Sequence, residues 1–301
     1  MKETPLITIG LTCFNCEKTI ERALKSAIDQ DWPNKEIILI DDKSIDNSKI
    51  VLSKLKSQYP NIQLILNSQN QGLAYNENLI IKNAKGEFLA FFDGDDESEV
   101  NRIRKQYERF VEYKIRHSDS KIFVYSNRNV VPIEDTKKKF TSLGIGRKSP
   151  EPYGKIVADY LLKVKSKSDN FYWGVFGSGT MFAKTACLKN LKGFDENFRR
   201  GAELDLWIRA AIKGYHFISV NELLMTQYVT FGTHKTLNKD LLSRKQLVKK
   251  HKKYLIQNLL YVSSFLNFYA WYWYQKRIYI MGHIFRFFSK CFSVMSKFKK
   301  M

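Results

Sequence analysis

The chain has 301 residues, 44% of them hydrophobic and 14% aromatic. It can therefore bury a sizeable core as one large or two small domains, which excludes a disordered chain. Its formal charge of +20 is uneven, because residues 235–301 hold fifteen Lys or Arg side chains and Asp240 as their one acid. Four cysteines are too few for a disulfide scaffold at this length. Cys13 and Cys16 form a CxxC pair without a second pair at zinc spacing, which favours simple packing over a metal or redox role.

Through residue 125, apolar runs alternate with amphipathic segments, which is the pattern of a parallel sheet covered on both faces by helices. Strands are predicted at 6–11, 36–40, 62–66, 88–92 and 122–125, and helices at 20–28, 46–58, 72–84 and 98–116. This order predicts an α/β fold with a Rossmann-like, mainly parallel sheet of the nucleotide-binding kind. The N-terminus lacks the apolar segment of a secretory signal, so we expect a cytoplasmic protein.

The next hundred residues are less regular. Residues 132–152 contain three prolines, two glycines and a run of three lysines, which indicates a mobile loop or insertion rather than a core element. Residues 174–184 are apolar and rich in glycine, as in a strand that passes close to a ligand or another backbone. A short helix is predicted after Glu203, followed by strands at 215–220 and 223–229.

The acidic tetrad Asp93-Gly94-Asp95-Asp96 directly follows the predicted strand 88–92. Closely spaced carboxylates at one edge of a sheet are hard oxygen ligands, and a divalent cation and a diphosphate could meet there. The alternative is a solvated turn in which Gly94 supplies backbone freedom.

Five segments occur in one order along the chain. They are Thr12-Cys13-Phe14-Asn15, Asp41-Asp42-Lys43-Ser44, the tetrad, and Gly193-Phe194-Asp195-Glu196 before Glu203-Leu204-Asp205-Leu206-Trp207. Together they resemble the family 2 glycosyltransferases of bacterial glycan, lipopolysaccharide or capsule synthesis, inverting enzymes of the GT-A fold that use nucleotide-diphospho sugars. The resemblance covers about residues 5–235, which implies a catalytic domain over 1–235 and leaves 236–301 as a helical C-terminal region.

The resemblance implies that Thr12, Phe14 and Asp42 hold the nucleotide. An aromatic face can stack on a base, and a carboxylate can accept the imide N–H of uracil. The alternative for Phe14 is an ordinary core aromatic. The alternative for Asp41 or Asp42 is to cap the N-terminus of the following helix.

The tetrad corresponds to the DxD motif of the family. Asp93 and Asp95, with Gly94 between them, are thereby implied to position the diphosphate and to bind Mg²⁺ or Mn²⁺ as a Lewis acid, with Asp96 in support. His234 falls where related enzymes often place a residue that meets the metal or the diphosphate, although a histidine in a polar loop is more often exposed to solvent. Lys82 and Arg102 could also meet phosphate, but surface salt bridges are the favoured interpretation for both.

The sequence departs from the family at the catalytic base. The family commonly has Glu-Asp two residues before the Asp-Leu-Trp segment, and this chain has Ala202-Glu203. Alignment on Asp205-Leu206-Trp207 makes Glu203 the implied general base, although its extra methylene requires a compensating shift. Asp205 is the reserve candidate, or it could pair with Arg209 at i+4 on the same helix.

The C-terminal region is basic and aromatic. Residues 254–275 contain no charged side chain but are interrupted by polar ones, so they are a marginal membrane span, and the aromatic run 271–274 suits a bilayer interface. We expect an amphipathic helix lying in an anionic membrane surface, with a homo-oligomer seam as the alternative and nucleic acid as the least favoured partner. A cut after about residue 253 is expected to leave the catalytic region intact. The apolar stripe is Met281, Phe285, Phe288, Phe292 and Met295, and the basic residues away from it are Arg286, Lys290 and Lys297.

These features lead to one expected function with two alternatives. The resemblance implies transfer of a hexose or N-acetylhexosamine, with inversion, from a UDP-sugar to a hydroxyl of a lipid-linked or cell-surface glycan, by a protein peripheral to the cytoplasmic face of the plasma membrane. A glycoside hydrolase with two carboxylates is one alternative. The other is a nucleotide-sugar-binding scaffold in which Ala202-Glu203 has lost catalysis.

Overall fold

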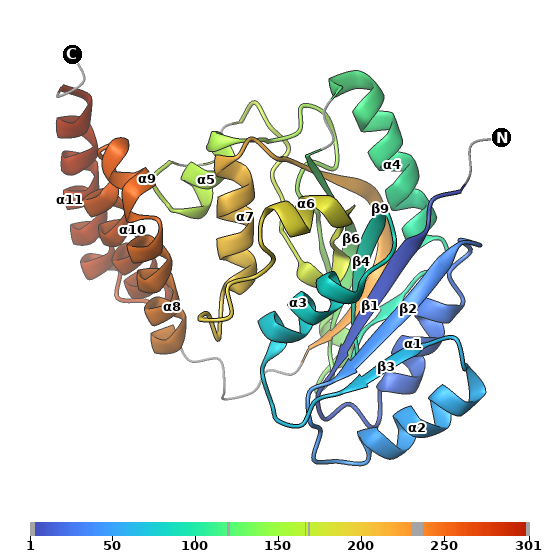
Figure 1. Cartoon of the computed structure of the whole chain (residues 1–301). Helices are drawn as coiled ribbons and strands as arrows, with labels where there is room; N and C mark the ends of the chain where they lie inside the picture. Colours follow the sequence, from blue (N-terminus) through green and yellow to red (C-terminus); the bar gives the residue numbers. More distant parts are fainter. Residues whose placement is uncertain (1–3, 119–120, 166, 168, 230–236, 299–301) are drawn as a thin grey trace.

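The computed structural model describes residues 4–118, 121–165, 167, 169–229 and 237–298. Within them, the strands form one nine-stranded sheet (Figure 1). The strands are β1 (Ile7–Cys13), β2 (Lys35–Asp41), β3 (Gln63–Leu66), β4 (Phe88–Asp93), β5 (Glu97–Ser98), β6 (Ile122–Pro132), β7 (Phe140–Ser142), β8 (Phe182–Lys184) and β9 (His216–Val229). Their order is β3-β2-β1-β4-β8-β6-β9-β5, and β7 pairs with β6.

Helices cover both faces of this sheet, as the alternating pattern predicted. One core joins the sheet to α1, α2 and α4, and the other joins it to α3, α5, α6 and α7. The helices are α1 (Ile20–Ile28), α2 (Ser48–Gln58), α3 (Leu73–Asn83), α4 (Arg102–His117), α5 (Lys155–Leu161), α6 (Thr185–Asn190), α7 (Ala202–Ile212), α8 (Leu237–Lys250), α9 (Lys252–Gln257), α10 (Tyr261–Gln275) and α11 (Tyr279–Phe298).

The sheet is parallel in its first half and mixed in its second. β1 pairs in parallel with β2 and β4, and its apolar residues are buried because helices cover both sides. β8 then runs antiparallel to both β4 and β6. The two strands predicted at 215–229 are one strand, β9, whose pairing with β6 shifts register around Asn127, as at a β-bulge. The predicted α/β fold is confirmed, with a mixed sheet.

Two expectations for the middle of the chain need correction. Residues 132–152 are not simply a loop, because β7 extends the sheet beside β6 and Ile145 is fully buried in the core. The glycine-rich segment 174–184 is a strand only at β8, and much of the remainder is a loop. Gly174 in that loop does approach another backbone, since a Cβ atom there would lie 2.3 Å from the carbonyl oxygen of Gly144.

The C-terminal helices pack against the sheet domain. In Figure 1, α8 to α11 form a layer beside α5 and α7. Val248 of α8, Leu255 of α9 and Phe268 of α10 belong to the main core, and α11 packs on α10. None of the helices in the described ranges has the length and apolar character that a bilayer span needs. Part of the aromatic run predicted for a membrane interface is used internally: Tyr272 is buried, and the ring of Trp271 lies 4.3 Å from the guanidinium of Arg244.

Candidate functional site

The tetrad lies at the carboxyl end of β4, beside the end of β1. Thr12 and Asp93 face each other in register, and the Gly94 amide donates to the Thr12 carbonyl at 3.1 Å. A Cβ atom on Gly94 would lie 2.6 Å from that carbonyl oxygen. Gly94 is therefore needed because the two chains approach closely, rather than for the turn freedom that the solvated-turn alternative assigned to it.

The tetrad carboxylates repel one another in a partly dehydrated setting. Burial, with the charge of Asp95 adding to it, raises the pKa of Asp93 to about 6. Burial together with Asp93 and Asp95 raises the pKa of Asp96 to about 8, although the Asp96 carboxylate also accepts a hydrogen bond from the Tyr228 amide at 2.9 Å. This excess of negative charge does not fit a solvated turn, and it favours a bound cation.

Two arginines offset part of this charge. Arg102 is fully buried and donates to the Phe91 carbonyl at 2.9 Å, so the predicted surface salt bridge is wrong for this residue. Burial lowers the pKa of Arg102 to about 9, against the opposing effect of Asp93 and Asp96. Burial also lowers the pKa of Arg128 on β6, again opposed by Asp96 and Asp93. Lys82 is exposed on α3 and makes no ion pair with another described residue.

Gly177 and Gly179 allow a loop to pack closely against Asp93 of the tetrad and Arg128. A Cβ atom on Gly179 would lie 2.2 Å from Oδ2 of Asp93, and one on Gly177 would lie 2.0 Å from Nη1 of Arg128. A side chain at either position would therefore force Asp93, Arg128 or the loop to shift. The glycine-rich segment predicted to pass close to a ligand or a backbone in fact also lies against these two charged side chains.

The residues implied to hold the nucleotide lie at the ends of β1 and β2. Phe14 is 47% exposed, so it is not a core aromatic. Asp42 is buried and accepts hydrogen bonds from the amides of Gln71 and Gly72, both at 2.8 Å, which fixes the loop that leads into α3. Asp41 accepts from the Ser44 amide. Neither aspartate caps α2, whose N-cap residue is Asn47.

A cleft of about 620 Å³ opens between the N-termini of α3 and α7. Glu203, near the start of α7, lines it, and its carboxylate makes no hydrogen bond or ion pair with another described residue. Arg199 and Arg200 lie on the same wall, and Nη1 of Arg200 is 2.7 Å from Oδ1 of Asp240. The cleft thus presents an unpaired carboxylate next to basic groups.

Glu77 is a site residue that the sequence did not suggest. It lines the cleft from α3 and is only 2% exposed, and its Oε2 atom has no hydrogen-bond partner. Burial raises its pKa well above the usual value, and the nearby charges of Glu203 and Asp93 add to this effect. Burial therefore favours the neutral form of the Glu77 carboxyl group more than in an exposed glutamate. One sequence signal could have revealed it: Glu77 falls on the buried stripe of α3, three residues after Ala74 and four before Ile81.

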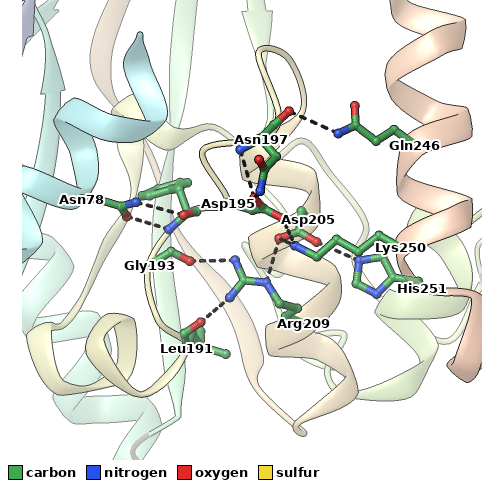
Figure 2. A network of polar contacts seen from close by, with 11 residues as sticks. Asn78, Leu191, Gly193, Asp195, Asn197, Asp205, Arg209, Gln246, Lys250 and His251 are labelled. Carbon is green, nitrogen blue, oxygen red and sulfur yellow. Dashed lines mark hydrogen bonds and ion pairs between the residues drawn. The ribbon is translucent and has the colours of Figure 1, made fainter. Parts of the chain in front are cut away.

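Asp205 has partners on every side (Figure 2). It lies 2.7 Å from Arg209 Nε, 2.8 Å from Lys250 Nζ and 2.9 Å from His251 Nε2. Although its burial acts in the opposite direction, these hydrogen bonds and charges lower its pKa to about 2. The pairing with Arg209 considered from the sequence is present.

The same network holds the Gly193-Phe194-Asp195-Glu196 segment in place. Asn78 of α3 donates to the Phe194 carbonyl at 2.9 Å and accepts from the Phe194 amide at 2.8 Å. Lys250 also contacts Asp195 at 2.5 Å. This motif therefore joins α3, α7 and the C-terminal helices (Figure 2).

Two of the three implied metal ligands, Asp93 and Asp95, lie within the described residues. His234 lies outside the described residues. Among the residues that are described, no three or more His, Cys, Asp or Glu side chains form a group that could hold a metal ion. The raised pKa of Asp93 beside Asp95 nevertheless fits a divalent cation, because Mg²⁺ commonly takes one or two carboxylates and completes its shell with water and substrate phosphates.

Comparison with known proteins shows similarity to glycosyltransferases. The sequence model described as Glycosyl transferase family 2 matches residues 8–155. A Campylobacter jejuni protein named GalNAc(5)-diNAcBac-PP-undecaprenol beta-1,3-glucosyltransferase is 27% identical over 250 residues, which cover 81% of this chain and 74% of that protein.

Two solved structures share the fold. Staphylococcus aureus TarS 1-349, crystallised with UDP-GlcNAc, has a TM-score of 0.59 and 16% identity over 87% of this chain and 72% of its own. The mannosyltransferase PcManGT from Pyrobaculum calidifontis, in complex with GDP-Man and Mn²⁺, has a TM-score of 0.54 and 17% identity over 84% of this chain and 65% of its own.

Proposed function

Residues 8–155 match the Glycosyl transferase family 2 model, and we propose that this chain is a member of that family that transfers a sugar, with inversion, from a UDP-sugar to an acceptor hydroxyl. The observation that carries the proposal is the cluster of mutually repelling carboxylates at the end of β4. Glu203 is close enough to this cluster for its charge to raise the pKa of Asp93. The ligands named for TarS and PcManGT support a nucleotide-sugar donor and a divalent cation.

Thr12, Phe14 and Asp42 would hold the nucleotide. The exposed ring of Phe14 is available to stack on a base. A carboxylate offers about four lone-pair positions, and Asp42 uses three of them on Gln71, Gly72 and Asn67, so one remains for the imide N–H of uracil.

Asp93 and Asp95, on either side of Gly94, would hold Mg²⁺ or Mn²⁺ together with the diphosphate of the donor. A divalent cation there supplies charge that offsets the negative charge growing on the departing diphosphate. Asp96 would support this arrangement without contacting the ion, because its carboxylate accepts a hydrogen bond from the Tyr228 amide.

Glu203 acts as the general base. The acceptor oxygen attacks the anomeric carbon from the face opposite the diphosphate and passes its proton to the Glu203 carboxylate. The new C–O bond forms as the bond from the anomeric carbon to the diphosphate oxygen breaks, and UDP leaves with the electron pair. Asp205 is poorly suited to this step, because three basic groups hold it and keep its pKa near 2.

The acceptor is a lipid-linked or cell-surface glycan, and the sugar is a hexose or an N-acetylhexosamine. The name of the C. jejuni relative, which specifies a diphospho-undecaprenol acceptor, supports this class. We infer that the protein acts at the cytoplasmic face of the plasma membrane, which its basic C-terminal region would contact as a peripheral protein.

UDP release with a panel of UDP-sugars and Mn²⁺ tests the proposal. We expect release with at least one UDP-sugar, faster with an added glycan acceptor and abolished by a chelator. Binding of UDP-sugars, seen as a raised thermal midpoint, without any release would instead support the scaffold alternative. Hydrolysis of a glycoside without a nucleotide donor or metal would support the hydrolase.

A further inference from the structure

A second cavity, far from the tetrad in sequence, lies between the end of α5 and the C-terminal hairpin of α10 and α11. Its volume is about 590 Å³. Lys163, Lys165 and Lys167 line it from the chain after α5, Trp271 and Tyr274 from α10, and Arg286 and Lys290 from α11. None of the described residues lining it is acidic. We call this cavity the basic pocket.

The basic pocket is a built feature of the fold. Lys163 has a left-handed backbone, with φ of 58°, immediately after α5. Two side chains of α10 hold this turn, because Ser264 donates to the Leu162 carbonyl and Asn267 donates to the Lys163 carbonyl, each at 2.7 Å. The hydroxyls of Ser263 and Ser289, 2.7 Å apart, join α10 to α11. The cations on the two sides of the pocket are thereby fixed relative to each other.

Most cations of the basic pocket lack an acidic partner among the described residues, although Lys163 and Lys167 lie 5.3 and 5.6 Å from the ring of Tyr160. Lys165 lies 3.2 Å from Asp159, which offsets its charge. Lys163, Lys167, Arg286 and Lys290 make no ion pair with another described residue. Burial lowers the pKa of Lys163, and the like charges of Arg244 and Lys167 lower it further, so an anion placed here would relieve this repulsion.

We propose that the basic pocket binds the phosphate of an anionic lipid headgroup and orients the protein on a membrane surface. This inference rests on the membrane contact proposed above, and not on the proposed sugar transfer. Lysine and arginine side chains are the usual partners of phosphate oxygens, and Tyr274 is of a type that favours the headgroup level of a bilayer.

The outer face of α11 indicates a lipid source for the phosphate. Ile280, Ile284 and Phe287, spaced as one helical stripe, are 75%, 43% and 63% exposed. An apolar stripe on the helix that also carries Arg286 and Lys290 suits insertion at the boundary of headgroups and acyl chains. A second copy of the chain fits this face poorly, because residues 241–301 contain no acidic side chain and two such faces would repel each other.

The predicted stripe is confirmed only in part. Phe288 and Phe292 are exposed, whereas Met281 and Phe285 are half-buried, with the Phe285 ring stacked on Tyr269 of α10 at 5.3 Å. The side chains of Met295 and Lys297 lie outside the described part. The face offered to a membrane is therefore rotated from the predicted one.

The test compares two double variants of the full chain with the same loss of charge. K163Q/K290Q removes two cations of the basic pocket, and K249Q/K253Q removes two exposed lysines outside it. Binding is measured by co-sedimentation with phosphatidylcholine vesicles that contain, or lack, phosphatidylglycerol. We expect the pocket variant to bind the phosphatidylglycerol vesicles about tenfold more weakly than the control variant, because it loses charge-assisted hydrogen bonds as well as diffuse attraction.

Thermal midpoints and UDP release are measured on the same preparations, and both should match the unsubstituted protein. Equal loss of vesicle binding in the two variants would contradict phosphate binding in the basic pocket, since the loss of net charge alone would then explain the weaker binding. A midpoint raised by glycerol phosphate, without preference for phosphatidylglycerol vesicles, would overturn the lipid as ligand in favour of a soluble phosphate. Vesicle binding needs no donor, so a failure of the proposed transfer would leave this result unaffected.

Discussion

His251 Nε2 lies 2.9 Å from Oδ1 of Asp205, so a residue between α8 and α9 holds a buried carboxylate in the first turns of α7. Glu203 precedes Asp205 by two residues on the same helix. The C-terminal helices therefore help to fix the position of the proposed base, although none of their residues has a role in the proposed chemistry.

Replacing Asp205 by asparagine should destabilise the protein. A carboxylate with a folded-state pKa of about 2, below its unfolded value of roughly 3.9, contributes stability above about pH 4 and loses it as the pH falls toward 2. Asp205→Asn removes the carboxylate partner of Arg209 and leaves Lys250 paired with Asp195 alone, so the free energy of unfolding at pH 7 should fall by about 3 kcal/mol. Urea denaturation at pH 7 measures this change.

The matched control for Asp205 is Glu222→Gln, which removes a carboxylate 2.6 Å from Lys105 in an exposed ion pair. Its cost should stay below about 1 kcal/mol. Equal stability of Asp205→Asn and the unsubstituted protein at pH 7 would contradict the structural role of the network.

Glu203→Gln keeps the size of the side chain and removes its basicity. We expect kcat for transfer to fall by roughly 10²-fold or more, with KM for the donor changed only a few-fold. The control is Glu196→Gln, since Glu196 lines the same cleft, is exposed and accepts a hydrogen bond from Asn78. Steady-state kinetics that show comparable losses in the two variants would remove Glu203 from the role of base.

Glu77→Gln should change how stability depends on pH. Because the folded-state pKa of Glu77 is raised, the stability associated with its protonated form is complete below the unfolded pKa of roughly 4.3 and is lost as the pH rises. Glutamine stays neutral throughout. The variant should therefore match the unsubstituted protein near pH 4 and exceed it at pH 8, in urea denaturation with a chelator present. A constant difference at both pH values would show that folding does not raise the pKa of Glu77.

Binding of Mn²⁺ in the presence of UDP should strengthen from pH 6 to pH 8. Asp93, with a pKa of about 6, must lose its proton to serve as a ligand, so protons compete with the cation at the lower pH. Isothermal titration calorimetry should show an affinity several-fold higher at pH 8, and Asp95→Asn should weaken binding at both values. Full UDP release by Asp95→Asn in chelator would remove the tetrad from metal binding.

Shortening the chain should have effects that depend on where it ends. A chain ending at Lys276 lacks α11 but keeps Leu255 and Phe268 in the main core. We expect it to fold, to retain UDP release and to lose binding to anionic vesicles. A chain ending at Lys253 loses both core residues, so we now expect it not to fold, in contrast to the sequence-based expectation that a cut there leaves the catalytic region intact. Circular dichroism and vesicle co-sedimentation measure these outcomes.

Local sequence patterns predicted the first half of the fold well. The buried run before Asp93 and the spacing of Ile20, Ala23 and Leu24 each fix an element through contacts within a few residues, so strand and helix bounds were close to those observed. The tetrad was identifiable because it ends such a run.

The surroundings of the tetrad were less predictable, because they come from distant segments. The charge of Arg128 acts on Asp93 and Asp96 only because β6 and β8 add to the sheet beside β4. The sequence predicted Arg102 to lie on the surface because a charged side chain at the start of a helix is ordinarily solvated. The packing of α8 and α10 against the main core could not be predicted either, because their apolar residues fit a membrane surface as well as a protein core.

Gly179 has a practical consequence for mutational scans of this enzyme. A methyl group at this position would collide with Oδ2 of Asp93, so the loop or the carboxylate must move. Gly179→Ala would therefore score as an inactivating change, although the glycine offers no functional group and every acidic residue of the tetrad is still in place. A scan of substitutions would therefore make residue 179 look as intolerant as the aspartates. Measuring cation binding directly would distinguish a variant in which Asp93 is displaced from one in which an aspartate is removed.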